Sequence, residues 1–432
     1  MSAVAPVPAR TASARQMLAW AFYDWASSPF FAVVITFVFA TYVTTVVAPD
    51  EIVGTAQWSR MTVLSALIIA IASPILGAVA DAGGPRKPWL LGFTLASAVG
   101  TSLLWYVRPE HDYLLLALAV ILFANVCNEI AQVFYNAMLP DLADRDHLGR
   151  WSGWGWGLGY IAGIVALGLT LVVFVQPEPP LFGLDPASAE DVRITGPILA
   201  VWLILFSLPL FLYTPDRPAT ARPLRESIRH GLTVLVATIK DVRRNANIAR
   251  FLLARLIYND GLNTLFAFGG IYAAGTFGMS LTEVLLFGIA LNVTAGIGAF
   301  GFAFLDDRLG SKPTILIGIC GLFVAGTIAL LTHDKTVFWG VALVIGIFIG
   351  PTQSASRTLM ARLAPPEQRT EMFGIYALTG RVTAFLGPLM FGTATAWFET
   401  QRAGMATILV MFVLGGLLLT RVREPVRARS AG

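Results

Sequence analysis

Four polar side chains recur along one apolar stretch of the chain. Asn125, Glu129, Gln132 and Asn136 are separated by four, three and four residues. In an α-helix this spacing places all four side chains on one face. An ionisable group at the middle of a bilayer is costly, so such groups usually face a bundle interior or water. The pattern favours a helix with one hydrated face, although hydrogen bonds between packed helices would also explain it.

Other charged residues inside apolar stretches include as many acids as bases. The acids are Asp24, Glu129 and Asp260, and the bases are Arg255, Arg357 and Arg381. Burial requires such a balance, and both a solute pathway and structural ion pairs between helices would supply it. For Arg357, snorkelling to the membrane interface is an equal alternative to ligand contact.

Amides accompany these charges at helical spacing. Arg255, Asn259 and Asn263 are four residues apart in turn, and Gln353 lies four residues before Arg357. A cavity that carries both signs of charge beside amides suits a zwitterion such as an amino acid. A buried carboxylate could also take up a proton in one state and release it in another, and Glu129 and Asp24 are the first candidates for this coupling.

The elements that carry these residues must be membrane helices. The chain has 432 residues, of which 56% are apolar and 13% charged, and soluble proteins are about 25% charged. The 28 Phe, 11 Trp and 10 Tyr residues exclude a disordered chain. Two cysteines exclude a disulfide scaffold. The composition therefore predicts a polytopic membrane protein that does not bind nucleic acid.

A membrane helix needs about 20 mostly apolar residues. Twelve runs of this kind occur, at residues 17–46, 59–80, 88–107, 112–138, 150–175, 194–214, 249–275, 282–304, 313–332, 336–361, 371–397 and 403–420. The runs lack the alternation of β-barrel strands. We expect an all-α integral membrane protein with twelve transmembrane helices.

The basic residues predict how these helices are oriented. Of the 30 Lys and Arg residues, 22 fall at the termini and in loops on one side of the predicted bundle. Because cytoplasmic loops carry the excess of basic residues, both termini should be cytoplasmic and the protein should span the cytoplasmic membrane. The first apolar run is too long for a cleavable signal, so it should remain as a helix.

A basic break at residues 215–248 divides the twelve runs into six and six. Ile228, Leu232, Leu235, Val236 and Ile239 recur in it at helical spacing, which suggests an amphipathic helix on the membrane surface. A simple positive linker and a regulatory role are both compatible with this segment. We expect a six-helix bundle at residues 1–214, this linker, and a second bundle at 249–432.

The two halves also share a loop pattern, which indicates an internal repeat. In each copy an acid ends one helix, a glycine turns the chain and a cation is present. The residues are Gly77, Asp81, Gly84, Arg86 and Lys87 in the first half, and Asp307, Arg308 and Gly310 in the second. A charge near the terminus of a partner helix can pair with that helix's dipole.

This loop resembles the signature loop of the major facilitator superfamily, with Ala82 where a basic residue is usual. Residues 22–28, 134–141, 153–160 and 258–261 resemble the autophagy-related vacuolar amino-acid effluxer branch and its bacterial members. The resemblance implies two pseudo-symmetric six-helix bundles, with the first, fourth, seventh and tenth helices around a central cavity. It also implies that the two loops form a gate on the cytoplasmic side; the alternative is that Arg86 and Lys87 only anchor the topology of the chain.

The function that follows is secondary active transport rather than enzymatic catalysis. No phosphate-binding loop of the ATPase type occurs, and the histidines and cysteines are too scattered for a metal site. We expect a monomeric exporter of an amino acid or similar zwitterion that works by alternating access, with protons as a candidate coupling ion and no cofactor. The alternatives are a carrier of peptides, organic ions or drugs, a membrane enzyme or lipid flippase, and a non-transporting scaffold or receptor.

Overall fold

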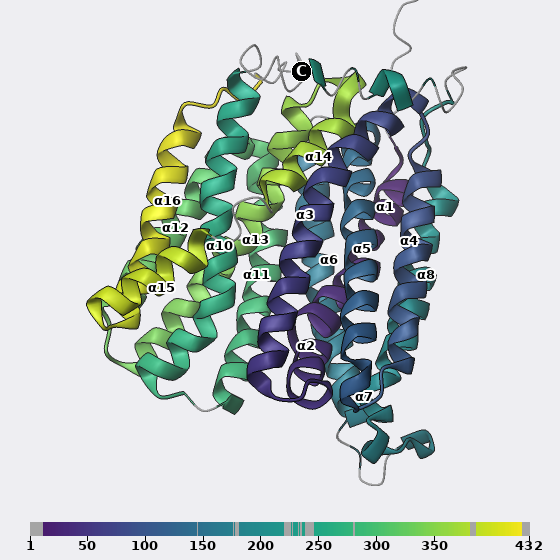
Figure 1. The fold of residues 1–432 in the computed structure, drawn as a ribbon. Helices are drawn as coiled ribbons and strands as arrows, with labels where there is room; N and C mark the ends of the chain where they lie inside the picture. Colours follow the sequence, from purple (N-terminus) through teal and green to yellow (C-terminus); the bar gives the residue numbers. More distant parts are fainter. Residues whose placement is uncertain are drawn as a thin grey trace, which may run out of the picture.

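The computed structural model describes residues 12–144, 146–175, 177, 181–219, 226, 228–231, 233, 236–237, 246–279, 281–380 and 386–425. Within these ranges all regular structure is helical, which confirms the predicted fold class. Long helices run side by side along one direction (Figure 1). The start of α1 and the end of α16 lie at the same end of the bundle, which we call the terminal side.

The first half of the chain forms the helices up to residue 213. One continuous span, Ala14–Val47, consists of α1 (Ala14–Pro29), the π-helical segment η1 (Phe30–Phe37), α2 (Val38–Tyr42) and the π-helical segment η2 (Val43–Val47). It is followed by α3 (Glu51–Gly83), α4 (Lys87–Ser102), α5 (Leu114–Leu142), α6 (Leu148–Leu169), α7 (Glu190–Arg193) and α8 (Thr195–Tyr213). A π-helical turn, η5 (Thr170–Val175), extends α6.

The second half repeats this arrangement of long helices. It contains α10 (Ala246–Phe277), α11 (Leu281–Leu309), α12 (Ser311–Leu331), α13 (Lys335–Leu363), α14 (Arg369–Thr379), α15 (Leu386–Phe398) and α16 (Gln401–Thr420). The eleventh predicted span corresponds to α14 and α15, and residues 381–385 between them are outside the described ranges.

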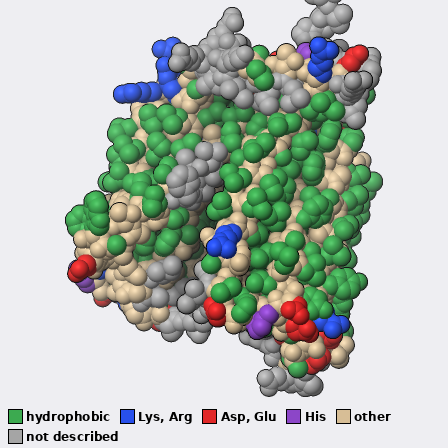
Figure 2. Space-filling model, in the orientation of Figure 1, with side chains coloured by type: hydrophobic (Ala, Val, Ile, Leu, Met, Phe, Trp, Pro, Cys, Tyr) green, Lys and Arg blue, Asp and Glu red, His purple; other side chains and the backbone are tan. Residues whose placement is uncertain are grey.

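Ten helices of the described ranges are long and apolar enough to cross a membrane, where the sequence predicts twelve. These ten helices do not include α10, although α10 has 32 residues. Its polar residues, among them Arg255, Asn259 and Asp260, lower its mean hydropathy. Figure 2 shows hydrophobic side chains over the middle of the visible face, with most charged side chains at its two ends. This band matches the outer surface of a membrane protein.

Local sequence signals set several of the helix ends. Ser13 and Gln16 form a capping box at the start of α1, and Asp50 caps α3. Gly84 and Gly310 follow α3 and α11 with φ angles of 99° and 102°. Only glycine adopts such angles without strain, so both positions let the chain turn into the next helix.

The two halves meet closely on the terminal side. α3 packs along α14, and α6 packs along α11. A Cβ atom on Gly374 would lie 2.6 Å from the Ser73 carbonyl oxygen, and one on Gly153 would lie 2.5 Å from the Ala303 Cβ. These glycines therefore allow helices from opposite halves to touch backbone to backbone.

Most of the predicted linker lies outside the described residues. Of its apolar positions, Leu232, Leu235 and Ile239 are among those residues, whereas Ile228 and Val236 are helical and exposed. A Cβ atom on Gly231 would lie 2.7 Å from the Ala78 carbonyl oxygen of α3. The division into two bundles and an amphipathic linker stays a prediction.

Candidate solute cavity and gate

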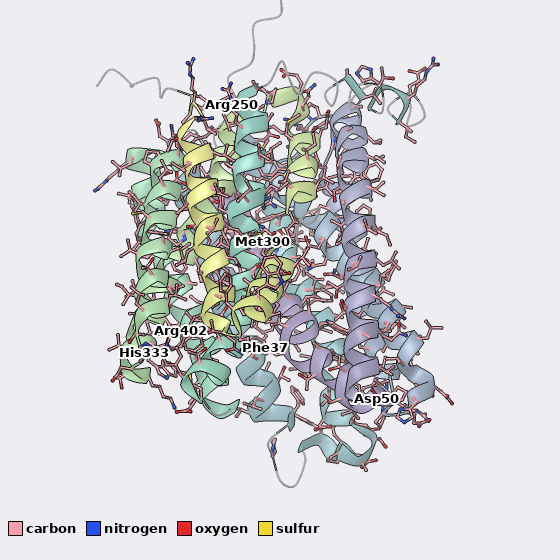
Figure 3. All side chains as sticks on the ribbon, turned by 60° about the vertical axis from the view of Figure 1, so that its left-hand side comes forward. Phe37, Asp50, Arg250, His333, Met390 and Arg402 are labelled. Atoms are coloured by element: carbon pink, nitrogen blue, oxygen red, sulfur yellow. The ribbon has the colours of Figure 1, made fainter. Side chains whose placement is uncertain are left out.

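A cavity of about 1260 Å³ lies between the two halves. Its lining includes Thr45, Val46 and Leu330, close to the ends of their helices on the side opposite to the termini. In Figure 3, Phe37 of this lining lies nearer to the end that carries His333 and Arg402 than to Arg250 at the terminal side. The cavity therefore reaches the side opposite to the termini and extends inward past the middle of the bundle, where Asp24, Arg255 and Arg357 line it.

Most of the polar residues predicted for a solute pathway line this cavity. They are Asp24, Glu129, Gln132, Asn136, Arg255, Asn259, Asn263, Gln353 and Arg357. Asn125 and Asp260 do not line it, and Arg381 lies outside the described residues. The lining combines both signs of charge with several amides, as the sequence pattern requires for a hydrated path.

The innermost part of the cavity carries an ion pair between the halves. Arg357 Nη1 of α13 lies 2.9 Å from Asp24 Oδ2 of α1. The Tyr135 hydroxyl of α5 donates to the same carboxylate oxygen at 2.9 Å. Asp24 is 8% exposed and Arg357 is 2% exposed. The two charges are thus buried together and satisfy one another.

The first half supplies further partners for the Arg357 guanidinium. Its Nε donates to the Ser152 hydroxyl at 2.9 Å, its Nη2 to the Ser152 carbonyl at 2.6 Å, and its Nη1 to Asn136 Oδ1 at 3.3 Å. The rings of Trp20 and Tyr135 lie within 6 Å of the cation. Ser152 was not predicted as a site residue, because a serine beside glycines in the first turns of an apolar helix carries no distinguishing signal.

The second buried cation, Arg255, has a different environment. Its Nη1 donates to the Tyr376 carbonyl at 2.7 Å and to the Thr379 hydroxyl at 2.9 Å, and the guanidinium stacks on the Tyr376 ring at 3.4 Å. Its Nε is buried with no hydrogen-bond partner. Among the described residues no carboxylate lies within 4.0 Å of it. A cation that is 8% exposed therefore faces the cavity without a carboxylate from the described part of the chain.

Several uncharged polar groups are arranged around the same space. Gln132 Nε2 donates to the Ser27 hydroxyl at 2.7 Å, and the Tyr160 hydroxyl donates to Gln353 Oε1 at 2.5 Å. The indole nitrogen of Trp156, whose side chain lines the cavity, has no hydrogen-bond partner. These groups can donate to and accept from a polar solute.

The cavity also extends into the second half as an apolar chamber. Its walls include Leu322 and Gly326 of α12 and Ile408, Leu409 and Phe412 of α16. In the first half, by contrast, no described residue of α4 or α8 lines the cavity, although these helices hold the corresponding places in the chain order. Among the described residues, the chamber at α12 and α16 therefore has no counterpart at α4 and α8, and no sequence pattern predicted it.

Two predicted pathway residues point elsewhere, which corrects the sequence-based placement. Asn125 Nδ2 donates to the Ser65 hydroxyl of α3 at 2.7 Å, so the first residue of the polar stripe joins two helices instead of facing the cavity. Asp260, which is 2% exposed, accepts from the Gly387 N–H of α15 at 2.9 Å. It stabilises the start of α15, where a carboxylate favours the helix dipole.

On the terminal side, the predicted loop residues of the first half bind the second half. Asp81 Oδ2 accepts from the Glu371 backbone N–H at 2.9 Å, in the first turn of α14, and Asp81 Oδ1 accepts from the Thr370 hydroxyl at 2.6 Å. A Cβ atom on Gly77 would lie 2.6 Å from the Thr370 carbonyl oxygen. Asp81 thus interacts with the N-terminus of a helix from the opposite half.

Arg86 ties this contact to a cluster of charges. Its guanidinium is hydrogen-bonded to Asp81, Asp141, Thr370 and the Ala137 carbonyl. Burial lowers the pKa of Arg86 to about 10, against the opposing effect of the Asp81 carboxylate. Lys87 Nζ donates to the Phe211 carbonyl at 2.9 Å, which anchors the end of α8.

Asp141 is the centre of this cluster, and the sequence pattern missed its role. It also pairs with Arg217 and Arg369. Burial, together with repulsion by Arg86, lowers the pKa of Arg369 to about 10. These residues come from distant parts of the chain, so their convergence could not be deduced from spacing.

The second copy of the loop makes the corresponding contact from the second half to the first half. Asp307 Oδ1 accepts from the Arg150 backbone N–H in the first turn of α6 at 3.0 Å. The turn residue Gly310 lies against Glu424, whose carboxylate accepts from the Ser311 and Lys312 N–H groups. Arg308 is exposed at the end of α11. Each half therefore places an acid on a helix N-terminus of the other half, and the bundle is closed on the terminal side.

The described helices are arranged like those of solved membrane transporters. The structure superposes on that of the fucose:proton symporter of E. coli with a TM-score of 0.69 and 13% identity, covering 95% of this chain and 98% of that one. This likeness defines the fold as that of the major facilitator superfamily, abbreviated MFS. The sequence model of the family described as "Vacuole effluxer Atg22 like" matches residues 45–150 and 148–431, so the chain belongs to that family.

Two relatives agree with this assignment. The chain is 26% identical over 413 residues to the MFS-type transporter YxiO of Bacillus subtilis, covering 95% of both chains. It is 22% identical to Autophagy-related protein 22 of Coccidioides immitis, covering 86% of this chain and 73% of that protein. The protein is a multi-pass membrane transporter of this superfamily and not an enzyme.

Proposed function

We propose that the protein exports an amino acid or similar zwitterion across the bacterial cytoplasmic membrane by alternating access. In this mechanism the bundles at residues 1–214 and 249–432 rock against each other, and the terminal side is the cytoplasmic side. In this account the structure represents the state in which the cytoplasmic side is closed and the cavity faces outward.

The observation that carries the proposal is the environment of Arg255. A buried guanidinium normally has an acidic partner, because an unpaired buried charge is destabilising. Arg255 has carbonyl, hydroxyl and aromatic contacts, and it lines the cavity without a described carboxylate beside it. The carboxylate of a solute would complete this site, and a guanidinium binds that group with two parallel hydrogen bonds.

The remaining parts of an amino acid find suitable surroundings in the same cavity. An ammonium group favours carboxylate and amide oxygens, which Glu129, Asn259 and Asn263 supply on the lining. The apolar chamber between α12 and α16 suits a bulky apolar side chain. We therefore expect large apolar amino acids to bind more tightly than glycine.

Export requires an energy source, and a proton gradient is our candidate. Asp24 and Glu129 are the carboxylates that line the cavity within the described ranges, so either can exchange a proton with the water it contains. Peptides and other organic anions remain the second class of cargo. They share the carboxylate that Arg255 would bind but lack the α-ammonium group.

The test is transport of radiolabelled leucine by purified protein in proteoliposomes under an imposed pH gradient. We expect Arg255→Gln to abolish transport. The matched control is Arg250→Gln, which removes an exposed arginine from the same helix and should leave transport unchanged. Equal loss in both variants, or transport that persists in Arg255→Gln, would contradict the role of Arg255.

The coupling ion is tested in the same vesicles. Collapse of the pH gradient should stop accumulation but leave exchange of internal for external leucine intact. Glu129→Gln should weaken proton-driven accumulation if Glu129 carries the proton. Unchanged accumulation in this variant would exclude Glu129 as the carrier and leave Asp24.

A further inference from the structure

The cavity lining changes from polar to apolar along α13. Its lining residues follow one face of this helix at spacings of three and four. From the terminal side outward they are Arg357, Gln353, Ile349, Ile345, Ala342 and Phe338. The inner end of the lining is therefore polar, and the rest of it is apolar.

α10 shows the same change from the same end. Residues that line the cavity along one face of this helix are Arg255, Asn259, Asn263, Phe266 and Gly270. Arg250, near the start of α10, lies at the terminal side (Figure 3). Both helices therefore place their polar residues nearest to the terminal side and their apolar residues further outward.

The apolar chamber is enclosed by the second half. α12 packs against α13 and α16, and α16 packs against α10 (Figure 1). Leu322, Ala342 and Ile408 line the chamber, and each is 2% exposed or less. The Tyr272 hydroxyl donates to the Ala329 carbonyl at 3.4 Å, which leaves its ring for contact with a ligand. An enclosed apolar space of this kind binds apolar groups in preference to water.

Aromatic rings close the outer end of the chamber. The Phe338 ring stacks on the rings of Phe277 and Phe287, with centroids 4.2 Å and 5.5 Å away. From Ile349 to Phe338 the lining of α13 extends about 16 Å along the helix axis. A carbon–carbon bond is about 1.5 Å long, so roughly ten or more bonds in line are needed to span this length. A leucine side chain is far shorter and would occupy only the entrance.

We propose that the apolar chamber binds the chain of an amphipathic amino acid, one whose apolar chain is longer than that of leucine or phenylalanine. The carboxylate binds Arg255 at the polar inner end, and the chain extends outward along α13 towards Phe338. The inference rests on the proposed function, because it uses the same carboxylate site. It narrows the cargo from apolar amino acids in general to those with a long chain.

A series of straight-chain amino acids tests the chamber. The ligands are norvaline, norleucine, 2-aminooctanoate and 2-aminodecanoate. Their affinities are measured by calorimetric titration of the purified protein in lipid nanodiscs, and empty nanodiscs correct for partition into lipid. Burial of one methylene group tightens binding about fourfold. We therefore expect the affinity to rise about fourfold with each added carbon up to 2-aminooctanoate, and to rise further with 2-aminodecanoate.

A substitution at Gly326 tests where the chain lies. Gly326 of α12 lines the chamber, and a Cβ atom there would lie 2.7 Å from the end of the Leu409 side chain. In Gly326→Leu the added side chain should fill the chamber and remove the gain from the longer ligands, while norvaline binding stays the same. The matched control is Gly340→Leu, at an exposed position of α13 with open space around it, which should retain the full series.

Equal affinities for norleucine and 2-aminodecanoate would overturn the proposal. A chain-length dependence that Gly326→Leu leaves intact would overturn it as well. If Gly326→Leu does not fold, the series measured on the unmodified protein still decides between a binding chamber and an unused space.

These outcomes are separable from those of the proposed function. Leucine transport without any dependence of affinity on chain length would refute the chamber alone. A steep dependence on chain length that persists in Arg255→Gln would support the chamber and contradict the carboxylate site.

Discussion

A single added methyl group at Gly155 should break the pair between the halves. The Cβ atom of an alanine there would lie 2.4 Å from Asp24 Oδ2 and 3.0 Å from Arg357 Nη2. Real Cβ contacts are longer than the first of these distances, so the carboxylate has to move. The same oxygen accepts the hydrogen bonds of Arg357 and Tyr135, each 2.9 Å long, and both would be lost.

The size of the effect follows from these contacts. A hydrogen bond to a charged group contributes about 1.5–3 kcal/mol to stability, so two of them contribute about 3–6 kcal/mol. Replacing glycine by alanine inside a helix returns about 1 kcal/mol. The expected net loss for Gly155→Ala is therefore about 2–5 kcal/mol.

The assay compares thermal unfolding of Gly155→Ala with that of Gly163→Ala in the same detergent. Gly163 lies on the same helix, and a Cβ atom there would meet only the Ala32 Cβ at 3.5 Å, an ordinary contact. The control should therefore be as stable as the unmodified protein or more so. Equal melting temperatures for the two variants would refute the reasoning, because helix propensity alone would then account for both.

Three other changes have defined outcomes. Gly77→Ala places a Cβ atom 2.6 Å from the Thr370 carbonyl and should increase thiol labelling of cysteines introduced on the terminal side, whereas Gly92→Ala, with open space around it, should not. Arg86→Gln should lower the melting temperature equally at pH 6 and pH 9. Its pKa of about 10 lies below the ordinary 12.5, so proton linkage changes stability only above about pH 10; a larger loss at pH 6 would contradict this. Ala342→Leu narrows the apolar chamber and should weaken leucine binding in a titration while glycine binding stays the same.

The sequence predicts most of the helical architecture because membrane spans depend on local composition. Long apolar runs and loop glycines at positions 84 and 310 define where helices start and end without reference to distant residues. The predicted run at residues 249–275 also corresponds to a helix, α10, although the residues that face the cavity interrupt it and keep α10 out of the ten helices that are apolar enough to cross a membrane. A helix that carries polar residues facing a cavity is thus harder to recognise as a membrane span from its hydropathy than a fully apolar helix.

The site was only partly predictable from the sequence. Helical spacing shows which side chains share a face of a helix, but it does not show which helix or cavity that face contacts. The stripe from Glu129 to Asn136 lines the cavity, whereas Asn125 at its end meets Ser65 of α3. Asp260 is beside cavity residues in the sequence, yet it binds the start of α15. Each outcome depends on the neighbouring helix, which a single sequence does not reveal.

The pairing of Asp24 with Arg357 was not predictable from the sequence. An equal count of buried acids and bases indicates that pairs exist, but it does not show which residues are partners. Arg357 had two equal interpretations, an interfacial anchor and a ligand contact, and the structure places it in an ion pair on the cavity floor. Gly155 shows why the pair fits, since only a missing side chain leaves room for it.

The most direct test of the proposed cargo compares leucine with its two half-analogues by thermal shift of the purified protein. Ligands stabilise the state that they bind. We predict that leucine raises the melting temperature, and that isopentylamine, which lacks the carboxylate, does not. 4-Methylpentanoate, which lacks the ammonium group, should have a weaker effect than leucine, and Arg255→Gln should abolish the response to both carboxylates. Stabilisation by isopentylamine equal to that by leucine would contradict a carboxylate site at Arg255.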